Sequence, residues 1–377
     1  MRKLAVLGML TAVVLLAASP FASAGDTASL TINKGPWLQN VTTTAITVMW
    51  QTNVASSSRV DYGASSGYGQ HVSNTTAVRL HEVRLTGLDP DARYHYQVAS
   101  AAETSASSAD HAFQTAVAPG TPFRFAVYGD TRSNPADHAA VIKSILASAP
   151  RFVLHTGDII ADGTKDSDWV RDFFTPAAPL LSEVAIFPCL GNHERNAARY
   201  YDYFSLPYGG GDHNERWYSF DYGDAHFSVL DTDTDYAPDS PQYAWLKDDL
   251  KNAAAPWKFV LHHHPAYSSG GHGSTEKVQR YLVPLYEQYG VAMVFSGHDH
   301  HYERSRKAGV YYLVTGGGGA PQYAPNLHPN PYQQRAEETL HHCTVDLTAT
   351  TATFRALRPD GSVLDTVALS RARATSR

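Results

Sequence analysis

Five short polar clusters each follow an apolar, strand-like run, and this arrangement constrains the fold more than any other feature of the 377-residue sequence. The runs are rich in β-branched and aromatic residues and alternate with helix-like segments such as residues 136–149 and 242–252. Such folds build their sites at one set of strand ends. The clusters therefore predict an α/β layered domain with one polar site, formed from residues 129–132, 157–158, 191–194, 262–265 and 297–304.

A second domain is predicted before the α/β domain. Short alternating runs at residues 46–52, 58–62, 82–85 and 94–98, separated by turn signals, are typical of an antiparallel β-sandwich. Trp50 suits a buried position between the sheets, and Tyr94 follows a turn as a tyrosine corner does. We expect the sandwich to cover residues 28–117 and the α/β domain to cover residues 121–370.

The first 24 residues are typical of a secretory signal peptide. A cationic start precedes an apolar run over residues 4–18, and residues 22–24 (Ala-Ser-Ala) form a typical cleavage site. The alternative is an uncleaved anchor, for which the apolar run is short. We therefore expect a secreted protein, extracellular or periplasmic, with no membrane span after cleavage. Cys189 and Cys343 would then meet oxidising conditions, but the sequence leaves open whether they pair.

The charge and composition of the sequence exclude several classes of function. The formal charge is −6, so no basic field attracts nucleic acid or anionic lipid, and no nucleic-acid partner is expected. Dinucleotide-binding and P-loop glycine motifs are missing from the sequence. The chain has 19 histidines against two cysteines, which indicates imidazole metal ligands or acid–base groups.

The polar clusters supply carboxylates, one amide oxygen and several imidazoles. This mixed oxygen and nitrogen donor set suits Fe, Mn or Zn better than Ca or Mg. Two such metals about 3.5–4 Å apart can hold both ends of an in-line displacement and generate hydroxide near neutral pH. The clusters therefore predict a dinuclear centre of transition-metal ions, whose identity the sequence does not fix.

In this order, the clusters resemble those of the calcineurin-like metallophosphoesterases, and more narrowly those of the purple acid phosphatases. Residues 298–304 are similar to the family signature Gly-His-x-His-x-Tyr-Glu-Arg, and residues 35–39 with 48–50 resemble the start of the family's fibronectin type III-like N-terminal domain. The resemblance implies an α/β domain of two mixed β-sheets flanked by helices, in four α/β/β/α layers.

The resemblance also implies roles for particular residues. Asp130 and His300 would hold the first metal, Asp158 would bridge, and Asn192, His263 and His298 would hold the second. His193 would face the phosphate as electrostatic partner or leaving-group acid, and His272 lies where the family places a substrate histidine. A solvated loop residue is the alternative for His272. His262, His264 and His301 are interpreted as flanking residues rather than ligands.

Two positions depart from the family pattern. The purple acid phosphatases have a tyrosine where this chain has Ala161, and the broader family has a histidine where this chain has Arg132. We therefore expect a protein that is not purple, with a first site completed by water or another residue. Arg132 is either in a salt bridge with a nearby carboxylate or in contact with a phosphate oxygen.

Together these features predict a secreted, acid phosphatase-like enzyme that hydrolyses small phosphomonoesters by in-line attack of a metal-bound hydroxide, with Asp158 and His193 in catalytic roles. A phosphodiesterase acting on nucleotides or lipid head groups is the alternative within the same chemistry. A non-catalytic exported binding protein is the alternative from another class. The sequence does not indicate the oligomeric state.

Overall fold

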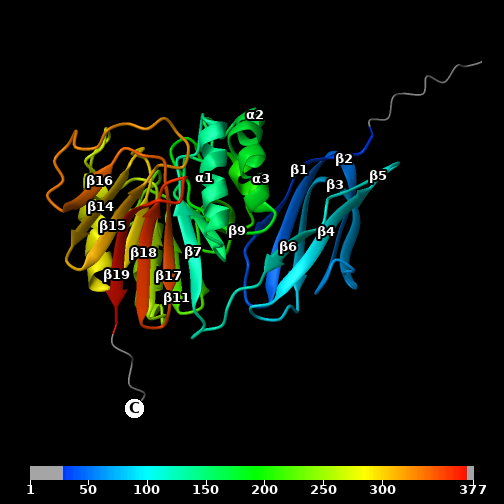
Figure 1. Ribbon diagram of the computed structural model, residues 1–377, viewed down its shortest axis with the longest axis horizontal. Helices are drawn as coiled ribbons and strands as arrows, with labels where there is room; N and C mark the ends of the chain where they lie inside the picture. The colour runs from blue at the N-terminus through cyan, green and yellow to red at the C-terminus, as the bar shows by residue number, and fades with distance from the viewer. Residues whose placement is uncertain (1–28, 372–377) are drawn as a thin grey trace, which may run out of the picture.

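The computed structural model describes residues 29–371. The predicted signal peptide, residues 1–24, lies outside the described residues. Two parts of the chain are distinct in Figure 1: an all-β part at the N-terminal end and a larger α/β part. This architecture confirms the predicted fold class. Among the described helices, none combines the length and the apolar character that crossing a bilayer requires.

Six antiparallel strands form the N-terminal sandwich: β1 (Ile32–Gln39), β2 (Ala45–Gly63), β3 (Gln70–Thr86), β4 (Arg93–Ala101), β5 (Ser105–Ser107) and β6 (His111–Gln114). The long strand β2 pairs with β1 through its first half and with β4 through its second half. Between these halves, the pairing of β2 with β3 shifts register twice.

The two aromatic predictions for the sandwich are confirmed. Trp50 is fully buried, stacks on His81 with ring centroids 4.6 Å apart, and donates from Nε1 to Ser100 Oγ at 2.9 Å. The Tyr94 hydroxyl accepts a hydrogen bond from the backbone N–H of Asp89 at 3.0 Å, which is the geometry of a tyrosine corner. Both side chains therefore stabilise the sandwich.

Two mixed sheets pack face to face in the α/β part. The first has the order β19-β18-β17-β7-β8-β9, and the second has the order β10-β11-β12-β13-β15-β14-β16. Phe125 of the first sheet contacts Phe227 and Phe259 of the second, with ring centroids 5.1 and 5.3 Å apart. The strands of the first sheet are β7 (Phe123–Tyr128), β8 (Phe152–His155), β9 (Ala185–Pro188), β17 (His342–Leu347), β18 (Thr351–Leu357) and β19 (Val363–Ser370). Those of the second are β10 (Tyr218–Tyr222), β11 (Ala225–Val229), β12 (Trp257–Leu261), β13 (Met293–Ser296), β14 (Tyr302–Lys307), β15 (Val310–Thr315) and β16 (Gln333–Glu337).

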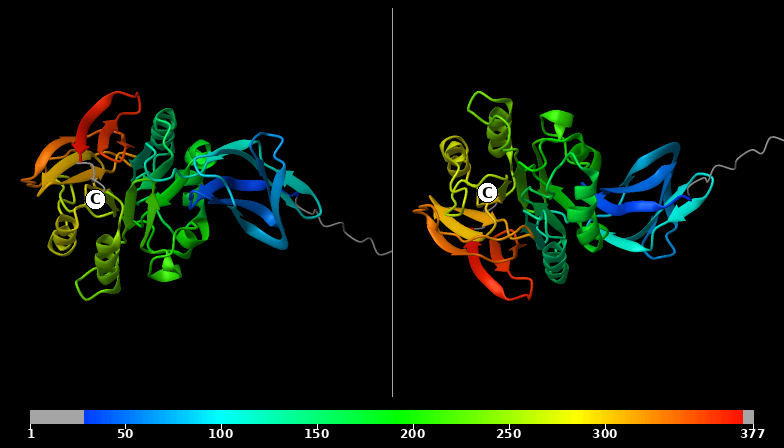
Figure 2. Two further views of the ribbon diagram at one scale, coloured as in Figure 1. Left: turned by 90° about the horizontal axis from the view of Figure 1, so that it is seen from below. Right: turned by 90° about the horizontal axis from the view of Figure 1, so that it is seen from above.

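Helices cover the outer faces of both sheets (Figure 2). On the first sheet lie α1 (Pro135–Ala147), which begins with a proline at its first turn, and α3 (Thr175–Leu181). On the second, α5 (Pro241–Asn252), α6 (Glu276–Tyr281) and α7 (Val283–Gln288) share an apolar cluster with the outward residues of β12, β13 and β15. The four layers are therefore α/β/β/α. The remaining short helices are α2 (Asp166–Asp168), η1 (Trp169–Phe174), α4 (Ala198–Tyr203) and η2 (Asp212–Asn214).

The sandwich packs directly on the α/β part. Trp37 Nε1 donates to the carbonyl oxygen of Tyr203 at 2.9 Å, and its ring lies 4.8 Å from that of Phe174. The Tyr96 hydroxyl donates to the carbonyl oxygen of Ser182 at 2.8 Å. Buried residues of both parts form one continuous apolar cluster. The sandwich therefore stabilises the first sheet on its β9 side.

Both cysteines lie inside the first sheet region. Cys189 follows β9 and Cys343 lies on β17, and both side chains are buried free thiols. In this structure they therefore pack as small apolar side chains, which answers the question that the sequence left open.

Candidate metal centre

The carboxyl ends of parallel strands from both sheets meet at one edge. Strands β7 and β8 are parallel neighbours in the first sheet, as are β12 and β13 in the second, and each runs into one of the predicted polar clusters. Three residues of these turns, Asp130, Asp158 and His298, have φ angles of 57°, 54° and 72°. Left-handed backbone is costly for non-glycine residues and concentrates at functional sites.

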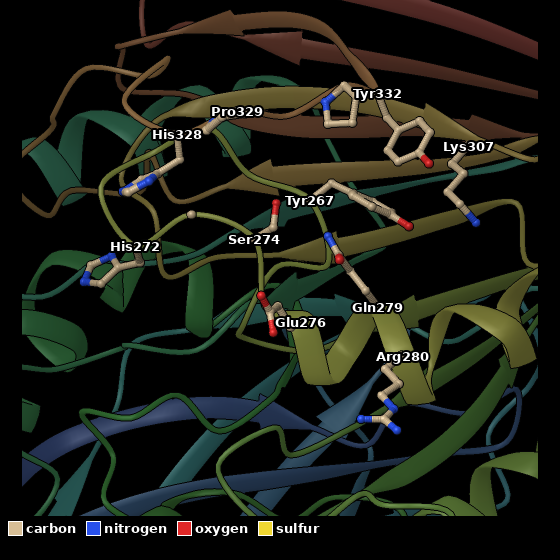
Figure 3. Close-up of a pocket in the computed structure, with 12 residues that line it drawn as sticks. Tyr267, His272, Ser274, Glu276, Gln279, Arg280, Lys307, His328, Pro329 and Tyr332 are labelled. Atoms are coloured by element: carbon tan, nitrogen blue, oxygen red, sulfur yellow. The ribbon is translucent and has the colours of Figure 1, made fainter.

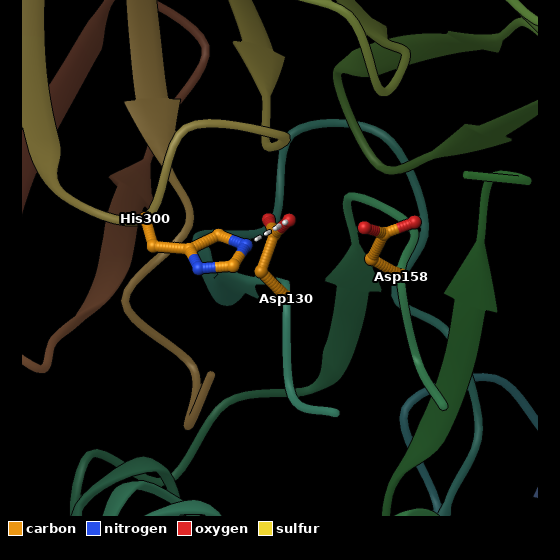
Figure 4. A group of neighbouring side chains, drawn as sticks. All are labelled: Asp130, Asp158 and His300. Carbon is orange, nitrogen blue, oxygen red and sulfur yellow. Dashed lines mark ion pairs between the residues drawn. The ribbon is translucent and has the colours of Figure 1, made fainter. Parts of the chain in front are cut away.

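Asp130, Asp158 and His300 form the first donor group (Figure 4). Each offers one ligand atom, and these atoms all lie within 4.8 Å of one another. His300 Nε2 lies 3.6 Å from Asp130 Oδ1, while its Nδ1 donates to the carbonyl oxygen of Pro321 at 2.8 Å. All three residues are buried, so the group is shielded from bulk solvent.

Asn192, His263 and His298 form the second donor group. Asn192 Oδ1 lies 3.1 Å from both His263 Nε2 and His298 Nδ1, and these two nitrogens are 3.2 Å apart. Asp158 Oδ1 lies 3.3 Å from His263 Nε2, so the same carboxylate borders both groups. The structure thus brings together all six residues that the sequence predicted as metal ligands.

The chemistry of these donors fits a pair of metal ions. His263 Nδ1 donates to the carbonyl oxygen of Thr156 at 2.8 Å, so its Nε2 faces Asn192 Oδ1 with a lone pair. Burial lowers the pKa of His263 well below its usual range, which keeps the ring neutral as a ligand must be. Burial and the Asp158 carboxylate raise the pKa of Asp130 well above its usual range. A cation between these groups relieves both the lone-pair contacts and the carboxylate repulsion.

Glycines let the backbone approach the donors closely. A Cβ on Gly297 would lie 2.2 Å from Asp130 Oδ2, and one on Gly316 would lie 3.1 Å from the same oxygen. A Cβ on Gly191 would lie 2.5 Å from Asp158 Oδ1. Only glycine fits at Gly297 and Gly191 without moving a carboxylate. These positions therefore hold the two aspartates in place.

Glu194 is a buried residue for which no role was predicted from the sequence. Its Oε2 accepts hydrogen bonds from the backbone N–H groups of Asp158 at 2.9 Å and Gly191 at 2.6 Å, and its Oε1 accepts from Ile159 at 2.8 Å. One carboxylate therefore fixes the turns that carry Asp158 and Asn192. Glu194 stands two residues after Asn192 in the 191–194 cluster, and this position is the sequence signal that could have indicated its role.

Arg132 and His193 lie beside the shared carboxylate. Arg132 Nε is 3.4 Å from Asp158 Oδ2, and its Nη2 is 3.5 Å from His300 Nε2, so the salt bridge, one of the two roles considered for Arg132, is present. His193 Nδ1 donates to the carbonyl oxygen of Ala161 at 2.7 Å, and its Nε2 lies 3.8 Å from Asp158 Oδ2. The position that lacks the family tyrosine thus orients His193 through its backbone.

His272 lies at the edge of the second donor group. Its ring centroid is 4.1 Å from that of His298, and 52% of its side chain is exposed. It also marks one end of a cavity of about 840 Å³ that extends along α6 to Lys307 (Figure 3). His272 contacts Asp299 and His298 on one side and is half exposed to solvent on the other.

A sandwich joined to a four-layer domain, with two donor groups meeting on one carboxylate, defines a candidate two-metal protein. Residues 123–302 match the family described as Calcineurin-like phosphoesterase, and residues 36–115 match Purple acid Phosphatase, N-terminal domain. The two matches together cover more than half of the chain. The chain therefore carries a calcineurin-like phosphoesterase domain, preceded by a domain of the kind found at the N-terminus of the purple acid phosphatases.

Individual relatives agree with this family. Purple acid phosphatase 23 of Arabidopsis thaliana is 28% identical over 294 residues, covering 65% of this chain and 64% of the plant protein. Acid phosphatase type 7 of Danio rerio is 28% identical over 338 residues, covering 77% of this chain and 74% of the fish protein. The chain spans less than two thirds of the plant protein's length.

A solved structure shows the same fold. The purple acid phosphatase PPD1 from yellow lupin (Lupinus luteus) superimposes with a TM-score of 0.79 at 20% sequence identity. The match covers 91% of this chain and 74% of the lupin chain, so it includes both the sandwich and the α/β part.

Proposed function

We propose that this chain is a metal-dependent, acid phosphatase-like enzyme that hydrolyses small phosphomonoesters. The observation that carries the proposal is the position of Asp158, which borders the Asp130 and His300 donors on one side and His263 on the other. When bound there, two Fe, Mn or Zn ions supply hydroxide near neutral pH and neutralise charge on the phosphate. The names of the relatives, purple acid phosphatase and acid phosphatase, support the same activity.

Three side chains at the centre are assigned to the substrate. Arg132 Nε is in an ion pair with Asp158 at 3.4 Å but makes no hydrogen bond with any described residue, and its planar guanidinium suits two phosphate oxygens. His193 Nδ1 donates to Ala161, which leaves Nε2 free; when the ring is the imidazolium, Nε2 carries a second proton that it can give to the leaving oxygen. His272 is assigned to hydrogen bonding with the substrate at the outer edge of the centre.

Replacing Asp158 tests the proposal. Asp158→Asn keeps the side-chain volume but removes the charge shared by the two donor groups, so we expect hydrolysis of p-nitrophenyl phosphate to fall by more than roughly 100-fold, with reduced metal content. Asp110→Asn, in the sandwich, is the matched control and should retain wild-type rates. Undiminished hydrolysis in Asp158→Asn contradicts the proposal.

Replacing Arg132 separates phosphate binding from a structural ion pair. A charge-assisted hydrogen bond contributes about 1.5–3 kcal/mol, so Arg132→Ala should raise KM for p-nitrophenyl phosphate by roughly 10- to 100-fold with metal content retained. Arg132→Lys, which keeps the charge, should recover part of the loss. Unchanged kinetics in Arg132→Ala would remove phosphate binding as its role.

A comparison of two substrates tests whether the enzyme prefers phosphomonoesters or phosphodiesters. We expect faster hydrolysis of p-nitrophenyl phosphate than of bis-p-nitrophenyl phosphate, and the reverse order would favour the phosphodiesterase.

We also propose export by a leader over residues 1–24. N-terminal sequencing of protein recovered from outside the producing cell should begin near Gly25, whereas a start at Met1 contradicts cleavage.

A further inference from the structure

Asp299 lies between two metal-ligand candidates in the sequence, His298 and His300, yet its side chain contacts the loop that carries His272. It is fully buried, and its Oδ1 accepts from the backbone N–H of His272 at 2.9 Å and from His272 Nδ1 at 3.0 Å. Its Oδ2 accepts from the Ser268 hydroxyl. The Tyr323 hydroxyl lies 3.2 Å from Asp299 Oδ1 and 2.9 Å from the carbonyl oxygen of His298.

The loop over residues 268–273 is built around this carboxylate. A Cβ on Gly270 would lie 2.5 Å from Asp299 Cγ, so the loop can approach only because this residue is glycine. Gly270 N–H donates to Ser268 Oγ at 3.0 Å, which closes the loop on itself. The neighbouring Ser269 donates from its backbone and its hydroxyl to the buried Glu303, at 2.8 and 2.7 Å. The 297–304 segment therefore holds this loop through Asp299 and Glu303, while His298 and His300 lie in the donor groups.

The hydrogen bond that His272 Nδ1 donates determines which tautomer the ring adopts. With Nδ1 protonated and donating to Asp299, the remaining nitrogen, Nε2, carries the lone pair or a second proton. The His272 side chain is half exposed, and Nε2 is the ring nitrogen that does not contact the buried carboxylate. His272 packs on His298 and lies at one end of the cavity in Figure 3.

We propose that Asp299 is a positioning residue that fixes the tautomer and the orientation of His272, so that His272 Nε2 meets the phosphoester substrate at the edge of the metal centre. This inference rests on the proposed phosphatase function. Asp299 acts only through His272 and does not touch the substrate.

A double-mutant cycle tests the coupling. Misplacing a positioning group can cost about 100-fold in rate, so Asp299→Ala should lower kcat/KM for p-nitrophenyl phosphate by roughly 10- to 100-fold with metal content unchanged. His272→Ala should cost about the same, and the double variant should be no slower than either single variant. Asp299→Asn keeps an oxygen acceptor and should recover most of the activity. Losses that multiply in the double variant would overturn the proposal.

Nitrogen NMR provides a readout that needs no turnover. In protein with ¹⁵N-labelled histidine, the His272 signal, assigned by its loss in His272→Ala, should show a protonated Nδ1 in the wild type and in Asp299→Asn. The signal should change to an averaged or Nε2-protonated ring in Asp299→Ala. An Nε2–H tautomer in the wild type would overturn the proposal. If the wild type hydrolyses no phosphoester, the proposed function fails, but the NMR result still decides whether Asp299 fixes His272.

Discussion

Replacing Glu194 by glutamine tests how the protein positions its shared carboxylate. The buried Glu194 carboxylate accepts three backbone hydrogen bonds, from Asp158, Ile159 and Gly191. A glutamine of nearly the same volume has one oxygen and one amino group, so at least one of these N–H groups must face a donor. Glu194→Gln therefore changes hydrogen bonding without opening a cavity.

The magnitude follows from the bonds that are lost. One buried N–H without an acceptor costs about 1–3 kcal/mol, and the other two bonds weaken because their acceptor is no longer charged. Burial and the Asp158 carboxylate raise the pKa of Glu194 well above its usual range, so loss of the charge offsets part of this cost when no metal is present. We expect the free energy of unfolding to fall by about 3 kcal/mol in metal-loaded protein and by less in metal-free protein.

Urea unfolding and metal titration provide the assay. Because groups that orient metal ligands typically contribute 10- to 100-fold in affinity, Glu194→Gln should weaken metal binding by about that factor. The exposed Glu183→Gln is the matched control and should change the free energy of unfolding by less than about 0.5 kcal/mol. A Glu194→Gln variant with wild-type unfolding and wild-type metal affinity would refute the reasoning.

Two further predictions concern other parts of the α/β domain. Burial alone would lower the pKa of His226, but hydrogen bonds with Asp221 and Asp249 outweigh it and raise the pKa to about 9. Protonated His226 and its two carboxylate partners stabilise the fold fully below pH 6.5, and this contribution is lost as pH rises through 9. In urea unfolding, His226→Gln should therefore lower the free energy of unfolding by about 2–3 kcal/mol at pH 6 and by less at pH 9.5. A loss that is the same at both pH values contradicts this prediction. Gly297→Ala places a Cβ against Asp130 and should lower bound metal, measured by elemental analysis, with the circular dichroism spectrum retained. Full metal content in that variant would show that the close approach is not required.

Much of the fold could be predicted because its strands carry a strong local signal. The apolar run at residues 123–128 is strand β7, and the helix-like segment at 242–252 lies within α5. The division into two sheets could not be predicted from these runs. Strand β17, more than 200 residues after β7, pairs with it in the first sheet, and such long-range pairing leaves no periodic pattern in either strand.

The donor residues of the candidate site could also be predicted, because each stands in a cluster directly after a strand. The residues that support them could not, since sequence spacing does not show where a side chain points. Asp299 lies between His298 and His300 but contacts the His272 loop. Gly316 is a similar case, because a Cβ there would lie 3.1 Å from Asp130 Oδ2, an approach that sequence spacing does not reveal.

The central claim is that two cations share the Asp158 carboxylate. Anomalous X-ray diffraction from crystals of the metal-loaded protein tests it most directly. We predict two peaks, one among Asp130, Asp158 and His300 and one among Asp158, Asn192, His263 and His298. A single peak, or peaks away from Asp158, would contradict the account.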